Sequence, residues 1–318
     1  MKAFITGIAG FAGSFLAEHL LAYGMEVSGT VRNTSKEDHI RHLLPYIRLH
    51  ACDLRDKAAV NNAIREAKPD YIFHLAAQSD VPSSWQHSIE TLYNNFACQT
   101  HLLEAVRTYR ADCKILIAGS SEQYGYVKPD ELPVKETNPF RPLNPYAISK
   151  ITQEHIGYQY YKSYGLQIVT VRAFHHTGPR RGENFVTSSF AKQIAEIESG
   201  LKAPVLYVGN LEAKRDFLDV RDVARAYRLA LECCDSGEAY NVASGRSMSI
   251  REVLGILLSL TDSDIDIQVE ASRLRPADSA EVSGDYSKLH SKTGWKPEIA
   301  IEQTMADLLN YWRAKITS

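Results

Sequence analysis

The chain has 318 residues, of which 44% are apolar, and a formal net charge of −2 at pH 7. It is too long for one small domain, and its apolar content excludes a chain that is disordered as a whole. The nearly neutral charge argues against general binding to nucleic acid, and no apolar run reaches the ~18 residues that a membrane-spanning helix needs.

Strand-like and helix-like segments alternate through the first half of the chain. Short apolar runs predict strands over 2–6, 26–31, 47–52, 71–75, 114–118 and 167–174. Segments with helical spacing lie between them, at 13–23, 57–67, 94–109 and 144–164. Strands separated by helices imply right-handed crossovers and a parallel sheet with helices on both faces. The pattern therefore predicts an α/β fold of the doubly wound Rossmann type.

This alternation breaks after residue 174. Pro179, Gly182 and Pro204 interrupt the following segment, and one later apolar run, at 238–243, is expected to return to the sheet as a strand. We therefore predict two domains. A dinucleotide-binding Rossmann domain comprises residues 1–172 and 214–244, and a smaller, discontinuous substrate-binding domain comprises residues 173–213 and 245–318.

Three glycines, Gly7, Gly10 and Gly13, lie between the first predicted strand and the first predicted helix. Residues without side chains permit a tight turn and let a pyrophosphate approach the backbone, while the helix N-terminus offers free N–H groups. Their placement favours a dinucleotide site over an ordinary turn. The GxxGxxG spacing, which encloses Phe11 and Ala12, resembles that of the extended short-chain dehydrogenase/reductase family.

The end of the second predicted strand indicates which dinucleotide is preferred. NAD-binding domains commonly place an acidic residue about 20 residues after the glycines, to hold the ribose 2′-hydroxyl. This chain instead reads TVRN at 30–33. Arg32 can face a 2′-phosphate with its planar guanidinium, which favours NADP(H) and leaves use of NAD(H) open. The family resemblance implies four further cofactor contacts, at Asp53, Leu54, Ala76 and Ala77.

Tyr146 and Lys150 are four residues apart in the predicted helix at 144–164, so they share one helix face. An ammonium near a phenol lowers the phenol pKa from about 10, which lets the tyrosine exchange a proton with a substrate oxygen as hydride moves. A serine-rich segment also follows the fifth predicted strand. The resemblance implies that Ser120, four residues before Tyr124, completes the catalytic group, with Ser121 as the competing assignment.

Later segments sharpen the resemblance toward the GDP-mannose branch of the family. They read AQSD at 77–80, GPRRGENFVT at 178–187, GN at 209–210, RD at 215–216 and RPAD at 275–278. Bidentate arginines bind a diphosphate well, so the resemblance implies substrate contacts at Arg180, Arg215 and Arg275, with surface or interdomain salt bridges as the alternative. Further substrate contacts are expected at Ser121, Glu122, His175 and Asn184.

Two activities remain open within this branch. A dehydratase needs an acid/base carboxylate beyond the tyrosine, and a Thr-Ser-Glu run supplies it in such enzymes. Here the run is Ser120-Ser121-Glu122, which keeps the glutamate but lacks the threonine. The short segment between Arg32 and Asp53 and the presence of His175 in place of asparagine also favour a reductase, which must exchange NADPH at each turnover.

The resemblance therefore implies reduction of the 4-keto group of GDP-4-keto-6-deoxy-D-mannose to GDP-D-rhamnose. The alternatives are 4,6-dehydration of GDP-mannose, or another epimerase or reductase reaction on a nucleotide sugar. The family also implies a homodimer formed through the helices at 94–109 and 144–164.

The cysteines and the N-terminus suggest where the protein works. Five scattered cysteines without a CxxC pair predict reduced thiols and no metal site: Cys52, Cys98, Cys113, Cys233 and Cys234. The chain enters an apolar segment after a single lysine, without the pattern of a signal peptide. We expect a cytoplasmic protein whose partner is a GDP-sugar rather than nucleic acid or a membrane.

Overall fold

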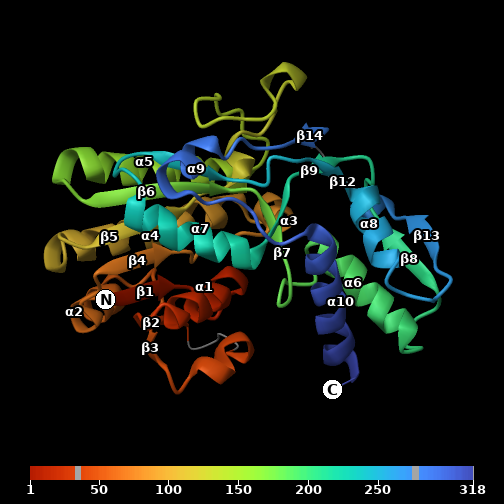
Figure 1. The fold of residues 1–318 in the computed structure, drawn as a ribbon. Helices are drawn as coiled ribbons and strands as arrows, with labels where there is room; N and C mark the ends of the chain where they lie inside the picture. The colour runs from red at the N-terminus through yellow and green to blue at the C-terminus, as the bar shows by residue number, and fades with distance from the viewer. Residues whose placement is uncertain (33–36, 274–278, 318) are drawn as a thin grey trace.

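A parallel sheet of seven strands forms the centre of the protein. The computed structural model describes residues 1–32, 37–273 and 279–317, and Figure 1 shows helices on both faces of the sheet. The strand order is β11-β6-β5-β4-β1-β2-β3, with every neighbouring pair parallel. The strands are β1 (Lys2–Thr6), β2 (Glu26–Val31), β3 (Ile47–Ala51), β4 (Tyr71–His74), β5 (Lys114–Ala118), β6 (Gln167–Ala173) and β11 (Ala239–Val242). The predicted Rossmann class is confirmed.

The order of the strands changes direction beside β1. From β1 the chain adds β2 and β3 on one side, and then β4, β5 and β6 on the other. Thr6 lies opposite His74 in the register of the β1–β4 pair, so the two strands end at the same edge of the sheet. In open α/β sheets the crevice at such a switch point, outside the carboxyl ends of the strands, is where ligands bind.

Successive residues of each strand face different helix layers. In β1, Ala3 and Ile5 pack in one apolar cluster with α1 (Phe11–Ala22) and α7 (Val220–Cys233). Phe4 packs on the opposite side, in the cluster that contains residues of α2 (Lys57–Ala67), α4 (Ser88–Tyr109) and α5 (Pro145–Tyr164). Because both faces are covered, the strands are apolar along most of their length.

A third apolar cluster contains no residue of the central sheet. It joins α6 (Val186–Glu198), α8 (Ile250–Leu258) and α10 (Ile301–Thr317) with β8 (Val205–Val208), and β13 (Asp266–Val269) pairs in parallel with β8. Figure 1 shows these elements together at the right of the sheet. The separate cluster supports the predicted division into two domains, whose boundaries stay a prediction.

Short elements link these parts. They are α3 (Val81–Gln86), β7 (His175–Thr177), β9 (Lys214–Arg215), β10 (Phe217–Asp219), β12 (Met248–Ser249), β14 (Glu281–Val282) and α9 (Ser287–Thr293). The strand expected near residue 240 does return to the sheet, as β11 beside β6. Among the residues that the structure describes, no helix combines the length and apolar character needed to cross a membrane.

One stretch differs from the sequence-based expectation. The helix expected to begin at residue 94 begins at Ser88, and α3 precedes it. Asp80 caps α3 by accepting a hydrogen bond from the Ser83 N–H (2.9 Å). In the first two turns of α4, Ile89 and Tyr93 are 82% and 62% exposed, so the apolar spacing of a buried helix face is missing there.

Candidate active site

The glycine turn after β1 leaves no room for side chains. Gly7 has a positive φ of 74°, a conformation that favours glycine. A Cβ atom on Gly13 would lie 2.3 Å from the Gly7 carbonyl oxygen. The Gly10 N–H donates to that same oxygen (2.9 Å), which closes the turn at the start of α1. The turn therefore brings bare backbone and a helix N-terminus together, an arrangement that suits a pyrophosphate.

A cleft of about 820 Å³ opens beside this turn, above the ends of the parallel strands. This volume lies within the range that is usual for small-molecule and cofactor sites. Most of the residues expected at a site line it together: Gly7, Gly10, Phe11, Ala12, Gly13, Arg32, Asp53, Leu54, Ala76, Ala77, Ser120, Ser121, Glu122, Tyr146, Lys150, His175 and Asn184. Residues far apart in sequence thus meet in one cavity.

Two arginines lie at the end of the cleft formed by β2 and β3. Arg32 lines it as expected, and Arg55, which the sequence analysis did not single out, lines it as well. Arg55 forms a two-pronged pair with Asp53, at 3.0 Å from Nε to Oδ1 and 2.6 Å from Nη2 to Oδ2. These hydrogen bonds are the main cause that lowers the pKa of Asp53 to about 2. Since the Asp53 charge is already matched, this end fits a ligand with an extra phosphate.

The predicted catalytic side chains occupy the middle of the cleft. Tyr146 and Lys150 are both buried, and the Lys150 ammonium donates to the Ala118 carbonyl oxygen (2.8 Å). Ser120 follows β5 and lines the same cleft, near enough to Tyr146 to favour the ionised phenol, an effect that burial outweighs. A tyrosine, a serine and a lysine therefore converge next to the glycine turn, as a proton-transfer group beside a dinucleotide requires.

Burial, rather than the neighbouring ammonium, dominates the ionisation of this group. The sequence-based expectation was that Lys150 would lower the pKa of Tyr146. Instead, burial raises the pKa of Tyr146 to about 12, and burial lowers the pKa of Lys150 to about 7. The Lys150 Nζ atom lies 5.9 Å from the centre of the Tyr146 ring. Tyr146 therefore holds its proton at neutral pH, which is the state of a proton donor.

Capping and buried polar contacts fix the helix that carries Tyr146. The Asn144 side chain caps α5 by accepting a hydrogen bond from the Ala147 N–H (2.8 Å). Asn95 of α4 accepts from the Gln78 N–H (2.8 Å) and donates to the Ser149 hydroxyl (2.9 Å). Asn95 thus joins the loop after β4 to Ser149, the residue before Lys150.

A polar cluster forms the inner end of the cleft. The Glu122 carboxylate accepts a hydrogen bond from the Asn144 amide (2.7 Å) and lies 3.7 Å from Nε2 of His175. Arg215 is buried, and its guanidinium donates to the Ser279 carbonyl oxygen (2.8 Å). It lines a small adjoining cavity, which it shares with Glu122 and His175. Glu122, His175 and Arg215 therefore surround the space next to Ser121.

The structure separates the two adjacent arginines at 180 and 181. Arg180, which has a positive φ of 69°, pairs with Glu18 (2.7 Å) and donates to the Ser14 hydroxyl (3.2 Å), so it is not brought to the cleft. Arg181 lines the cleft instead, and its guanidinium stacks over the Phe185 ring at 3.4 Å. Burial lowers its pKa to about 10, which leaves it cationic at neutral pH. Arg275 lies outside the described residues.

His176 is a second lining residue that the sequence analysis missed. Its ring stacks on Phe11 at 5.9 Å between centroids and 5° between planes. Burial lowers its pKa to about 4, so it is neutral at pH 7. Its neighbour His175 drew attention because it replaces a family asparagine, whereas nothing in the local sequence distinguished His176. Both histidines belong to β7, which pairs in parallel with β10, and both line the cleft.

Comparison with known proteins gives matches along nearly the whole chain. A family model described as GDP-mannose 4,6 dehydratase matches residues 4–308. The GDP-6-deoxy-D-mannose reductase of Pseudomonas aeruginosa is 34% identical over 315 residues, which cover 99% of this chain and 98% of that protein. A GDP-mannose 4,6-dehydratase of Yersinia enterocolitica is also 34% identical, over 348 residues that cover 97% of this chain and 92% of that protein.

Solved structures also include proteins with a similar fold. The structure of RMD from Pseudomonas aeruginosa complexed with NADPH is similar with a TM-score of 0.86 and 32% sequence identity, covering 99% of this chain and 100% of that one. The resemblance expected from the glycine, Tyr146 and Lys150 motifs is thereby confirmed. With a glycine turn, a buried Tyr146–Lys150 pair and matches of this extent, the chain belongs to the GDP-mannose 4,6-dehydratase family.

Proposed function

We propose that this protein uses NADPH to reduce the 4-keto group of GDP-4-keto-6-deoxy-D-mannose to GDP-D-rhamnose. One observation carries the proposal: the buried Tyr146 lies with Ser120 and Lys150 in a cleft that begins at a dinucleotide-type glycine turn. A ketone reduction needs such a proton donor beside the hydride donor. The match to a reductase of this substrate class along 99% of the chain supports the choice of sugar.

The proposed cofactor contacts follow the shape and charge of the cleft. The glycine turn and the N-terminus of α1 would hold the pyrophosphate, with Ala76 and Ala77 beside it. Arg32 and Arg55 would bind the 2′-phosphate, which distinguishes NADPH from NADH. Bound NADPH supplies the hydride, and the residues of this chain supply its position and the proton.

The proposed reaction assigns one task to each catalytic side chain. Tyr146 donates its proton to the O4 atom, which becomes a hydroxyl as hydride adds to C4. Ser120 donates a hydrogen bond to the same oxygen and aligns the carbonyl, and Lys150 binds the nicotinamide ribose. We further propose that Glu122 and His175 contact the sugar, while Asn184 and Arg215 contact the nucleotide. Of the two adjacent arginines, Arg181 rather than Arg180 lines the cleft, where it would be available to a diphosphate.

Dehydration of GDP-mannose is the second candidate, and Glu122 is the observation that favours it. Its carboxylate lies in the cleft, where it could take a proton from C5. Sequence identity does not separate the two activities, at 34% for each relative. Alignment length favours the reductase, because the alignment with the dehydratase runs over 348 residues whereas this chain has 318. That dehydratase contains segments that this chain lacks.

Two incubations distinguish these candidates. The purified protein is given GDP-mannose without added reductant, or GDP-4-keto-6-deoxy-D-mannose with NADPH, and the products are identified by NMR. We expect GDP-D-rhamnose from the second incubation and unchanged GDP-mannose from the first. Conversion of GDP-mannose to the keto sugar in the first incubation, without reduction in the second, would establish the dehydratase.

We also propose a homodimer that packs α4 and α5 against their copies in a second chain. Ile89, Tyr93 and Phe96 are spaced by four and three residues along α4, and Ile148 extends the exposed apolar surface to α5. Contiguous apolar surface of this kind commonly marks a protein interface. Light scattering should give twice the chain mass, and Tyr93→Lys should shift the protein to monomer.

We propose a cytoplasmic location for this protein, because all five of its cysteines are free thiols.

A further inference from the structure

We propose that Gln123 is a positioning residue that fixes Ser120 relative to the helix carrying Tyr146 and Lys150. This inference rests on the proposed function, because Ser120 matters only if it aligns the substrate carbonyl. Gln123 is fully buried and is not among the residues that line the cleft. It would therefore act on the reaction through Ser120 and not by touching the substrate.

The first step of the argument is the tight turn after β5. Ser120 is followed by a 3₁₀ turn over Ser121–Gln123. The Gln123 side-chain oxygen accepts a hydrogen bond from the Ser120 N–H (2.8 Å), and the Ser120 hydroxyl accepts one from the Glu122 N–H (3.2 Å). Hydrogen bonds within the turn thus fix both the backbone N–H and the hydroxyl of Ser120. Its hydroxyl direction depends on this turn keeping its shape.

The other end of the Gln123 side chain reaches α5. Its amide nitrogen donates to the Glu154 carboxylate at 2.7 Å. Glu154 lies four residues after Lys150 and eight after Tyr146, so the three side chains share one side of the helix. One glutamine therefore connects the turn that carries Ser120 to the helix that carries the other two catalytic residues.

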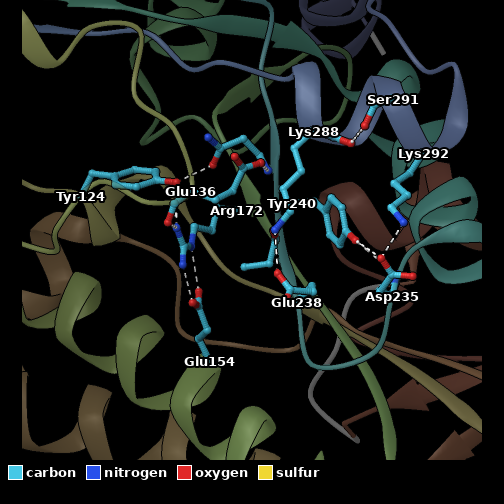
Figure 2. A network of polar contacts seen from close by, with 12 residues as sticks. Tyr124, Glu136, Glu154, Arg172, Asp235, Glu238, Tyr240, Lys288, Ser291 and Lys292 are labelled. Atoms are coloured by element: carbon cyan, nitrogen blue, oxygen red, sulfur yellow. Dashed lines mark hydrogen bonds and ion pairs between the residues drawn. The ribbon is translucent and has the colours of Figure 1, made fainter.

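A buried ion pair holds Glu154 in place. Arg172 of β6 binds its carboxylate with two hydrogen bonds, from Nε at 3.0 Å and from Nη2 at 2.5 Å. Arg172 also donates to the Tyr124 hydroxyl and to the Glu136 carbonyl oxygen, both at 2.9 Å. Figure 2 shows Arg172 between Tyr124 and Glu154. Because the guanidinium is anchored in the sheet, Glu154 offers Gln123 a fixed acceptor.

This arrangement needs an amide at position 123. A carboxylate accepts but does not donate, so Gln123 must direct its NH₂ group to Glu154 and its carbonyl oxygen to Ser120. A glutamate at 123 has the same shape, yet it would set two carboxylates against each other. The resulting repulsion would move the turn or the helix. The substitution Gln123→Glu thus disturbs the connection without creating a cavity.

Steady-state kinetics of Gln123→Glu test the proposal. We expect kcat to fall about 10–100-fold, the scale of a misplaced catalytic group, while KM for both substrates stays within about threefold. The double variant Gln123→Glu/Glu154→Gln restores one amide and one carboxylate, but leaves Arg172 a single acceptor oxygen at residue 154, so we expect partial recovery of the lost kcat. NADPH binding and thermal unfolding report the folded fraction of each variant.

Gln193 provides a matched control. It is a buried glutamine of α6 that bonds to a backbone N–H in the same way, from Tyr207 to its Oε1 (2.9 Å), and it lies outside the cleft. Gln193→Glu should lower stability and leave kcat unchanged. If Gln123→Glu behaves like this control, with lower stability and normal kcat, the residue has only a structural role and the proposal is wrong.

Hydrogen exchange separates this proposal from the proposed function. Exchange of the Ser120 amide should be faster in Gln123→Glu and slower again in the double variant, whatever the substrate. If the wild type fails to reduce the keto sugar while this exchange pattern holds, the assigned function is wrong and the positioning connection stands. If the wild type is active and neither kcat nor Ser120 exchange responds to Gln123→Glu, the positioning role is wrong and the function stands.

Discussion

The two ends of the cleft are built in different ways. The phosphate-binding part of the cofactor end rests on a short continuous segment, in which β1, the glycine turn, α1 and β2 follow one another along the chain. The sugar end takes Glu122 from the turn after β5, His175 from β7 and Arg215 from β9, which the fold brings together around one small cavity. A local sequence motif therefore describes the phosphate-binding part of the first end, whereas tertiary contacts define the second.

The largest effect is expected between these two ends, at Tyr146. Tyr146→Phe keeps the ring and removes the hydroxyl that donates the proton. We expect kcat for keto reduction to fall about 10²–10⁴-fold, the usual contribution of a general acid. Binding of NADPH, measured by fluorescence titration, should stay close to that of the wild type. Near-normal kcat in this variant would mean that another group protonates O4.

Alanine variants of Arg180 and Arg181 test which of the two residues binds the nucleotide ligands. Arg181→Ala removes a cation from the cleft, and we expect nucleotide binding to weaken about 10–100-fold, equivalent to about 1.5–3 kcal/mol for charged hydrogen bonds. Arg180→Ala removes a pair with Glu18 outside the cleft and should cost about 1 kcal/mol of stability or less. Calorimetric titration with GDP and NADPH provides the measurement. A stronger binding defect in Arg180→Ala would reverse the assignment.

A variant of Arg32 tests whether the cofactor end of the cleft prefers NADPH over NADH. Arg32→Ala should raise KM for NADPH about tenfold or more, because a charged hydrogen bond to the 2′-phosphate contributes roughly 1.5–3 kcal/mol. NADH lacks this phosphate and serves as the control, so its KM should change little. Equal effects on the KM values of both cofactors would show that Arg32 does not bind the 2′-phosphate.

Glu122 should give the smallest effect if the enzyme is a reductase. Glu122→Gln keeps size and hydrogen bonding but removes the basic carboxylate. Reduction of the keto sugar should stay within about tenfold of wild type, a barrier change of only ~1.4 kcal/mol. A dehydratase would lose far more, since proton removal from C5 would have no base. Abolished turnover of GDP-mannose in this variant would favour the second candidate.

Much of the fold could be predicted from the sequence, because strands buried on both faces form apolar runs. The glycine turn, Arg32, Tyr146 and Lys150 were visible because each belongs to a short spacing pattern. The sequence could not separate Arg180 from Arg181, since the turn of the backbone decides which of them faces the cleft. It also gave the wrong direction for the pKa of Tyr146, because the extent of burial is a tertiary property.

The most direct test of the proposed reaction is the number of NADPH molecules consumed for each sugar converted, with NADPH deuterated at the transferable position. The account predicts one NADPH oxidised per GDP-4-keto-6-deoxy-D-mannose consumed and one deuterium at C4 of the product. A dehydratase returns its hydride within each cycle and consumes no net cofactor. Conversion of GDP-mannose with no net oxidation of NADPH, and no reduction of the keto sugar, would contradict the account.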